Sequence, residues 1–245
     1  MEHAVGGGPK PWPRSRRSAD NALVLSIETV PEVCVPRGIP SLLPEQDALD
    51  HIPASIPTTD GEPLREIGGP GIVVLHSYAR AGWRHSVEQQ SLRAEALHRL
   101  QSVAKSLPTG FGLAIFDGWR PLDLQQELFD ALGKELDNGM AVAPATSDPA
   151  APPPHLTGGA VDLTLTWQGE PVALGTEFDE FSSATPLTAF ENAPGRVRDL
   201  RRLLYHSLRD CGYVALAEEW WHFEYGTRLW SVLTSEPVRY GPAKP

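Results

Sequence analysis

The stretch His155-Leu-Thr-Gly-Gly-Ala-Val-Asp162 leads from a loop into the strand on which the fold of this chain depends. In an extended segment from Ala160 to Thr166, Asp162 shares one face with Thr164, whereas the alternate apolar residues face the core. Asp162 is therefore an acid beside a buried layer, and burying its charge requires a partner. A cation shared with nearby imidazoles is one such partner, and the two glycines let the loop fold back so that His155 approaches Asp162.

A second stretch, Glu218-Glu-Trp-Trp-His-Phe-Glu-Tyr225, carries the other candidate chemistry. Read as a strand, it places His222 and Glu224 on one side and its aromatic residues on the other. Glu219 would then face away from His222. Both side chains reach one site only where the backbone bends or bulges near Trp220, which would put a carboxylate beside a metal without making it a ligand. Taken singly, none of these residues decides the function, because a loop histidine is usually solvated and paired tryptophans suit an ordinary core.

Strand and helix signals surround these stretches without the regular alternation of a parallel sheet, and they predict an α+β domain. The expected architecture is a small, mostly antiparallel central sheet with flanking helices. Strands are expected at 72–75, 113–116 and 160–166, and a hairpin is expected from 213–216 and 221–225. Helices are expected from a capping box at Ser86 and Gln89 to Leu107, from Pro121 through Leu136, and from Val197 to Cys211. Because Arg120 precedes a proline, it is expected at the end of a strand.

Composition divides the 245 residues into three parts. Residues 1–22 combine a glycine run with prolines and arginines, and we expect a flexible tail because they bury too little apolar surface to become ordered. Residues 23–63 alternate short apolar pieces with prolines, a pattern that suits extended segments packed on a domain. Residues 64–245 contain the predicted strands and helices and form the expected main domain.

Charge and cysteine content exclude several classes of function. A formal net charge of −10 argues against binding to nucleic acid or an anionic membrane. No apolar run approaches the about 20 residues of a membrane helix, and no signal peptide is recognised, so a cytoplasmic location is expected. With only two cysteines, any metal must use histidines and carboxylates. The expected partner is a small soluble substrate, and the sequence leaves the oligomeric state open.

Four blocks of the chain match the pattern of a known family. They are Asp117-Gly-Trp-Arg-Pro121, His155-x-x-Gly-x-Ala-x-Asp162-Leu-Thr-Leu, Gly175-Thr-x-Phe-Asp179 and Glu219-Trp-Trp-His222. In this order they resemble the VanX-type D-alanyl-D-alanine dipeptidases, zinc D,D-dipeptidases of peptidase family M15. The resemblance implies a hedgehog/DD-peptidase-like fold, with residues 64–245 as the catalytic domain. It also implies one zinc ion per chain, held by His155, Asp162 and His222.

The same resemblance implies a role for each remaining match. Glu219 corresponds to the general base that takes a proton from the attacking water, and Arg120 to the group that stabilises the developing oxyanion. Asp179 corresponds to the carboxylate that binds the free ammonium of a dipeptide, and Tyr78 to a substrate-binding position. Pairing with a free ammonium would select dipeptides over longer chains. An Asp179 that served only as a turn acid would leave the peptide length undetermined.

The leading hypothesis is hydrolysis of D-Ala-D-Ala to two D-alanines, in antibiotic resistance under glycopeptide challenge or in recycling of cell-wall D-alanine. Two departures from the family leave another small dipeptide containing a D-amino acid open. Pro153 stands where many members have a serine, and the residues after Tyr78 differ from the family's block. A third hypothesis is a non-catalytic zinc-binding module. The joint presence of Glu219 and Arg120 argues against it, because a structural zinc has four protein ligands and needs no base.

Overall fold

A mixed β-sheet forms the middle of the molecule in the computed structural model, which describes residues 27–40, 61–132, 144–146 and 148–245. The strand order is β2-β4-β5-β8-β7, with β6 paired to β5. Neighbouring strands are antiparallel except for β2 and β4, which are parallel. The strands of this sheet are β2 (Ile72–Val74), β4 (Phe111–Asp117), β5 (Ala160–Trp167), β6 (Glu170–Pro171), β7 (Val214–Ala215) and β8 (His222–Glu224).

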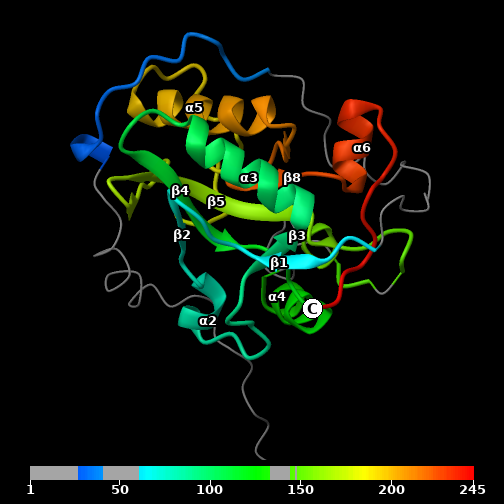
Figure 1. The fold of residues 1–245 in the computed structure, drawn as a ribbon. Coiled ribbons are helices and arrows are strands. Elements are labelled where there is room, and N and C mark those ends of the chain that lie inside the picture. Colours follow the sequence, from blue (N-terminus) through cyan, green and yellow to red (C-terminus); the bar gives the residue numbers. More distant parts are fainter. Residues whose placement is uncertain (1–26, 41–60, 133–143, 147) are drawn as a thin grey trace, which may run out of the picture.

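Helices cover the sheet, and a small antiparallel pair of strands lies beside it. In Figure 1, α3 and α5 lie next to each other above the sheet, while α2 and α4 lie below it. The helices are α2 (Ser77–Ala81), α3 (Ala94–Ser106), α4 (Leu122–Leu132), α5 (Arg196–Asp210) and α6 (Arg228–Thr234), with 3-10 turns η2 (Ile27–Thr29) and η4 (Pro154–Thr157). The separate pair is β1 (Leu64–Glu66) with β3 (Ser91–Arg93). The expected α+β class with a mostly antiparallel sheet is confirmed.

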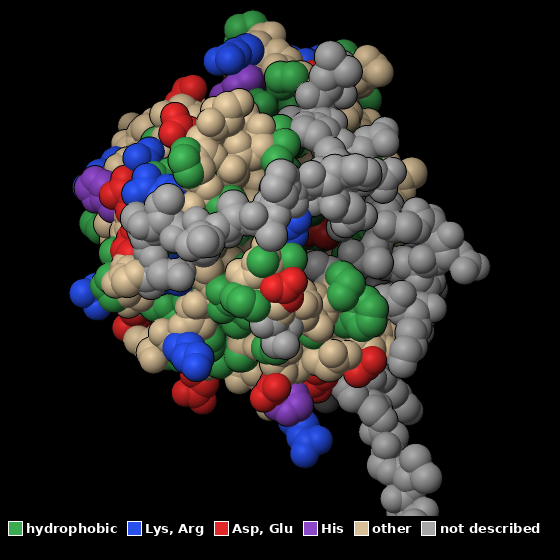
Figure 2. Space-filling model, turned by 90° about the vertical axis from the view of Figure 1, so that its right-hand side faces the viewer, with side chains coloured by type: hydrophobic (Ala, Val, Ile, Leu, Met, Phe, Trp, Pro, Cys, Tyr) green, Lys and Arg blue, Asp and Glu red, His purple; other side chains and the backbone are tan. Residues whose placement is uncertain are grey.

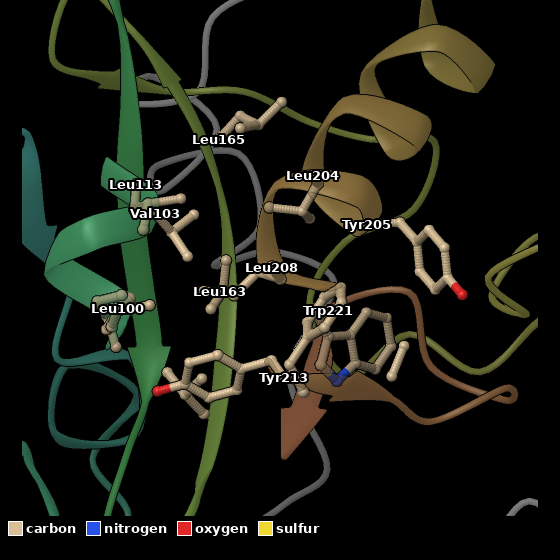
Figure 3. Close-up of a cluster of buried hydrophobic side chains, with 14 of the residues drawn as sticks. Leu100, Val103, Leu113, Leu163, Leu165, Leu204, Tyr205, Leu208, Tyr213 and Trp221 are labelled. Carbon is tan, nitrogen blue, oxygen red and sulfur yellow. The ribbon is translucent and has the colours of Figure 1, made fainter. Parts of the chain in front are cut away.

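Strand β5 separates the core from the polar side of the sheet. Its residues from Ala160 to Thr166 are all buried. Leu163 and Leu165 join the apolar cluster between the sheet and the helices, and Figure 3 shows them opposite Leu204 and Leu208 of α5. Asp162 and Thr164 point to the other face because side chains alternate along a strand. The predicted strand and its two faces are therefore confirmed.

The start of α3 corrects the prediction from sequence. Ser86 and Gln89 do not cap this helix, which begins only at Ala94. The Ser86 hydroxyl donates to the Trp83 carbonyl at 2.7 Å, and the Gln89 amide donates to Glu66 at 2.9 Å. The residues between them and the helix form β3, whose pairing with β1 satisfies backbone groups that a helix would otherwise use. Contacts between distant segments thus override a local capping pattern.

The remaining expected elements agree with the structure where it describes them. Strands at 72–75 and 113–116, the hairpin of β7 and β8, and the helix that ends near Cys211 are all present. Helix α4 follows Pro121 as expected, but its predicted continuation to Leu136 lies outside the described residues. The 1–22 tail also lies outside them. Among the described residues, no helix is both long and apolar enough to cross a membrane.

Residues 27–40 lie along α5. Together with residues 61–63, they are the part of the proline-rich 23–63 segment that the structure describes. Arg196 donates to the Glu28 carbonyl at 2.8 Å, and His206 Nε2 lies 2.9 Å from the Arg37 carbonyl. Val30 and Ile39 are buried. The packing of the whole 23–63 segment on the domain stays a prediction.

Gly159 offers a test of how tightly β5 is packed against the chain after β8. A Cβ at this position would lie 2.5 Å from the Tyr225 carbonyl oxygen. We expect Gly159→Ala to lower the free energy of unfolding by about 1–3 kcal/mol, because the added methyl group forces two backbones apart. Urea denaturation measures the change.

Gly68→Ala is the matched control, since a Cβ there meets nothing within 4 Å. It should change stability by less than about 0.5 kcal/mol. An equal loss for both variants would contradict the close approach.

Candidate metal centre and substrate cavity

Three buried side chains from separate segments converge on one point. His155 comes from η4, and Asp162 of β5 pairs in register with His222 of β8. His155 Nε2 lies 3.3 Å from His222 Nδ1 and 3.2 Å from Asp162 Oδ2, and His222 Nδ1 lies 2.9 Å from Asp162 Oδ1. One donor atom from each residue lies within 4.8 Å of the others. The three residues therefore form a possible metal site.

The spacing and protonation of this donor set fit a divalent metal such as zinc. Ligands at about 2.0–2.1 Å in a tetrahedral site are about 3.3 Å apart, close to the separations observed here. His155 Nδ1 lies 2.8 Å from the Gly118 carbonyl, and His222 Nε2 lies 2.9 Å from Glu224 Oε1. Both partners only accept hydrogen bonds, so each outer nitrogen carries the proton. When a metal is bound, the inner nitrogens would be free of protons and would offer their lone pairs to it.

The charge of Asp162 is stabilised by its neighbours. Burial alone would raise the pKa of Asp162, but the imidazoles of His155 and His222 outweigh burial and hold that pKa well below its usual range. The Arg120 Nη2 atom adds a contact at 3.4 Å to Asp162 Oδ2. The carboxylate is thus available as an anionic ligand throughout the physiological pH range.

Arg120 lies in the short connection between β4 and α4, where its orientation is fixed. Its Nε donates to Asp117 Oδ2 at 2.8 Å, and its Nη1 donates to Gln125 Oε1 at 2.9 Å. Its Nη2 also donates to the Tyr78 hydroxyl at 3.2 Å. A register shift in β4 between Ile115 and Asp117 brings Asp117 opposite Asp162. The guanidinium therefore lies beside Asp162, one of the three candidate metal donors.

Asp179 lies on the far side of Tyr78 from Arg120. The Tyr78 hydroxyl donates to Asp179 Oδ2 at 2.9 Å, so a single hydroxyl bridges the carboxylate and the guanidinium. Burial and the nearby charge of Asp162 raise the pKa of Asp179 to about 8, although Arg120 opposes the rise. The residue has a left-handed φ of 56°, which aspartate tolerates better than most side chains. A carboxylate in this setting gains much from a cationic partner.

Glu219 reaches the same site through a turn before β8. The His222 amide donates to the Glu219 carbonyl at 3.3 Å, and the chain turns at Trp220 and Trp221. This is the bend that the sequence requires near Trp220. Burial raises the pKa of Glu219, while the nearby His222 lowers it. The net rise makes this carboxylate a stronger base than a solvated glutamate.

A cavity of about 420 Å³ is lined by the three candidate metal donors together with Arg120, Asp179 and Glu219. The face turned to the viewer in Figure 2 is hollowed near its centre, and basic and acidic side chains are visible within the hollow. One wall of the cavity is a proline-rich segment that includes Pro149 and Pro152–Pro154, and Phe181 and Leu216 supply further apolar surface. The residues predicted as site residues line the cavity together: Tyr78, Arg120, His155, Asp162, Asp179, Glu219 and His222.

Three residues that orient the site had no role assigned from sequence. Asp117 and Gln125 hold Arg120, and Glu224 holds His222. Asp117 lies three residues before Arg120 in a matched block, and Glu224 shares a strand face with His222, so sequence patterns could have identified both residues. Gln125 lies in the first turn of α4. No sequence pattern indicates its contact with Arg120, because that contact depends on how the helix and the strand pack together.

Known proteins similar to this chain are dipeptidases. The Peptidase M15 family model, described as D-ala-D-ala dipeptidase, matches residues 63–236. A D-alanyl-D-alanine dipeptidase from Synechocystis sp. is 29% identical over 216 residues, covering 72% of this chain and 87% of the relative. Another from Escherichia coli is 31% identical over 135 residues, covering 52% of this chain and 65% of the relative. A third, from Streptomyces coelicolor, is 33% identical over 140 residues, covering 52% and 68%.

Two solved structures show weaker likeness. The vancomycin resistance D,D-dipeptidase VanXYg, in complex with a D-Ala-D-Ala phosphinate analog, has a TM-score of 0.34 and 19% identity, covering 61% of this chain and 57% of that chain. A vancomycin resistance D,D-pentapeptidase VanY in complex with Zn(II) has a TM-score of 0.35 and 17% identity, covering 66% and 83%. At these values neither likeness bears on function.

Metal binding should stabilise the folded chain. Adding Zn²⁺ to metal-depleted protein is expected to raise the thermal unfolding midpoint, because a ligand specific to the folded state adds about 4 kcal/mol at a thousandfold excess over its Kd. His155→Ala should abolish most of this rise by removing one donor. His98→Ala, at an exposed position of α3, should retain it. A rise that persists in full in His155→Ala would place the metal elsewhere.

Proposed function

The chain belongs to the Peptidase M15 family of D-Ala-D-Ala dipeptidases, and from this premise we propose that it hydrolyses D-Ala-D-Ala to two D-alanines with one zinc ion per chain. The observation that carries the proposal is the convergence of two imidazoles and a carboxylate with Glu219, Arg120 and Asp179 in one cavity. Either glycopeptide resistance or recycling of cell-wall D-alanine would use this reaction. Residues 64–245 would form the catalytic domain.

In the proposed reaction, each of these residues has a separate role. Bound zinc would lower the pKa of water and polarise the scissile carbonyl. Glu219 accepts the proton of the attacking water and passes it to the leaving amine, a role that its raised pKa favours. Arg120 offers donors near the carbonyl oxygen as negative charge develops there, and its contacts with Asp117 and Gln125 fix its orientation beforehand.

In this proposal, Asp179 determines which length of peptide the site accepts. Its buried carboxylate would pair with the ammonium of a free dipeptide, and ionisation of the carboxyl becomes more favourable when that cation arrives. An acylated amine or a longer chain offers no cation at this position and leaves the buried Asp179 without a cationic partner, so its binding would be weaker. The site would therefore prefer free dipeptides.

A second candidate substrate is another small dipeptide that contains a D-amino acid. Pro153 lines the cavity and supplies no hydroxyl to a substrate, and the cavity of about 420 Å³ has room for a larger apolar side chain.

The site argues against the third hypothesis, a non-catalytic zinc-binding module. Among the described residues three donors converge rather than the four typical of a structural zinc, and Glu219 and Arg120 share their cavity.

A dipeptide panel tests the proposed substrate. Purified zinc-loaded protein should release D-alanine from D-Ala-D-Ala and leave N-acetyl-D-Ala-D-Ala intact, because acylation removes the ammonium that Asp179 would bind. Ninhydrin or mass-spectrometric detection measures the products. Cleavage of other D-containing dipeptides alone would select the second candidate, and no cleavage of any dipeptide would refute the proposed activity.

Substitution of Glu219 tests the proposed base. Glu219→Gln should lower kcat by about 10²–10⁴-fold, because an amide cannot accept the proton. Zinc content should be unchanged, since Glu219 is not one of the three converging donors. Glu218→Gln alters the neighbouring carboxylate, which is outside the cavity lining, and should retain most of the activity. Full turnover by Glu219→Gln would assign the base to another group.

Tyr78→Phe tests how the hydrogen bond from Tyr78 affects the pKa of Asp179. Burial raises the pKa of Asp179 to about 8, and the hydrogen bond from Tyr78 opposes that rise. Removing the hydroxyl should therefore raise this pKa further. Because the ionised carboxylate pairs with an ammonium, the acid limb of kcat/KM should move to higher pH.

Tyr213→Phe is the control for the pH profile, since its hydroxyl donates at 2.7 Å to the Ala96 carbonyl, away from the cavity lining. Its acid limb should stay in place. An unmoved limb in Tyr78→Phe would separate Asp179 from substrate recognition.

A further inference from the structure

Arg201 is a buried arginine whose partners are carbonyl groups. It lies in α5 with 1% of its surface exposed. Its Nε donates to the Leu174 carbonyl at 2.8 Å, its Nη1 to the Pro186 carbonyl at 2.7 Å, and its Nη2 to the Ala184 carbonyl at 2.8 Å. No carboxylate among the described residues pairs with it. Burying a guanidinium in this way is costly, so the contacts that it makes are specific.

These three carbonyls lie at the two ends of one segment, residues 174–186. That segment leaves the neighbourhood of α5, carries Asp179 into the cavity and returns. Arg201 thus joins the beginning and the end of the segment through one planar group. A guanidinium can do this because its donors point in several fixed directions, whereas an ammonium concentrates its donors at one atom.

Trp220 also contacts this segment near both of its ends. Its indole Nε1 donates to the Thr176 hydroxyl at 2.7 Å, and its backbone amide donates to the Thr185 carbonyl at 3.2 Å. The Arg201 guanidinium lies over the Trp220 ring at 5.5 Å. Since Trp220 directly follows Glu219, the turn that carries the proposed base and the segment that carries Asp179 share one set of contacts.

The backbone at Asp179 needs such support. Its left-handed φ of 56° is sparsely populated for residues other than glycine, and such conformations persist where the surrounding structure holds them. Tyr78 is bonded to Asp179 through a single hydrogen bond of 2.9 Å. A shift of the segment ends would therefore move the carboxylate relative to Tyr78 and the metal donors.

We propose that Arg201 is a positioning residue for substrate recognition, which fixes both ends of residues 174–186 and thereby sets the place of the Asp179 carboxylate. The inference rests on the proposed role of Asp179 in binding the substrate ammonium. Arg201 does not touch the substrate. Its effect on the reaction passes through Asp179.

A double-mutant cycle tests this proposal in the full zinc-loaded chain with D-Ala-D-Ala. Arg201→Lys should raise KM about ten- to a hundredfold, because a displacement of about 1 Å is enough to disturb recognition. Zinc content should be unchanged, since the donors lie on other segments. In an Asp179→Asn background, Arg201→Lys should add less than a twofold change, because its effect passes through the missing carboxylate.

Arg202→Lys is the matched control on the same helix. Arg202 bonds to Glu191 at 2.9 Å and to the Val35 carbonyl at 3.1 Å, and not to residues 174–186. This variant should keep KM within twofold of the unmodified chain. If Arg201→Lys does not fold, Thr176→Val removes the Trp220 contact of the same segment and should show the same non-additivity with Asp179→Asn.

Three results would overturn the proposal, and the first two are distinguishable from the third. Additive losses in Arg201→Lys and Asp179→Asn, or an unchanged KM in Arg201→Lys, would refute the role of Arg201 while leaving that of Asp179 intact. An unchanged KM in Asp179→Asn would remove the ammonium-binding role itself, and with it the basis of the inference.

Discussion

The charge of Asp162, buried in the middle of a sheet, is the constraint around which the site is arranged. Two imidazoles and one guanidinium surround it, and each comes from a different segment: η4, β8 and the end of β4. Because an unpaired buried carboxylate would be costly, these segments have to meet at β5. The same requirement brings two imidazole nitrogens and an anionic oxygen together, which is an arrangement that can bind a divalent metal.

Strand β5 supports both the stability and the proposed chemistry of the chain. One face packs apolar side chains against α3 and α5, as Figure 3 shows, and the other presents Asp162 to the cavity. Two of the three proposed metal donors, Asp162 and His222, therefore lie on paired strands of the sheet. Asp179 and Glu219 lie instead on segments without regular structure, and their positions depend on contacts made by Tyr78, Trp220 and α5. The proposed substrate recognition would thus be more sensitive to supporting residues than the proposed metal binding.

Sequence patterns predicted those features that depend on local periodicity. The alternation along β5 placed Asp162, the proline after Arg120 placed that arginine at a strand end, and the conflict between Glu219 and His222 required a turn. Contacts between distant segments were not predictable in this way. The bond from Tyr78 to Asp179 spans 101 residues, and no local pattern reports it. For the same reason the pairing of β3 with β1 displaced the expected start of α3.

X-ray absorption at the zinc edge of the purified, zinc-loaded chain reports the atoms bound to the metal and therefore tests the proposed site of His155, Asp162 and His222. We expect a first shell of nitrogen and oxygen at about 2.0–2.1 Å, with the multiple-scattering pattern of two imidazoles and no sulfur. In His222→Ala the imidazole contribution should fall to one. A sulfur ligand at about 2.3 Å, or an imidazole count unaffected by His222→Ala, would contradict the His155, Asp162 and His222 site.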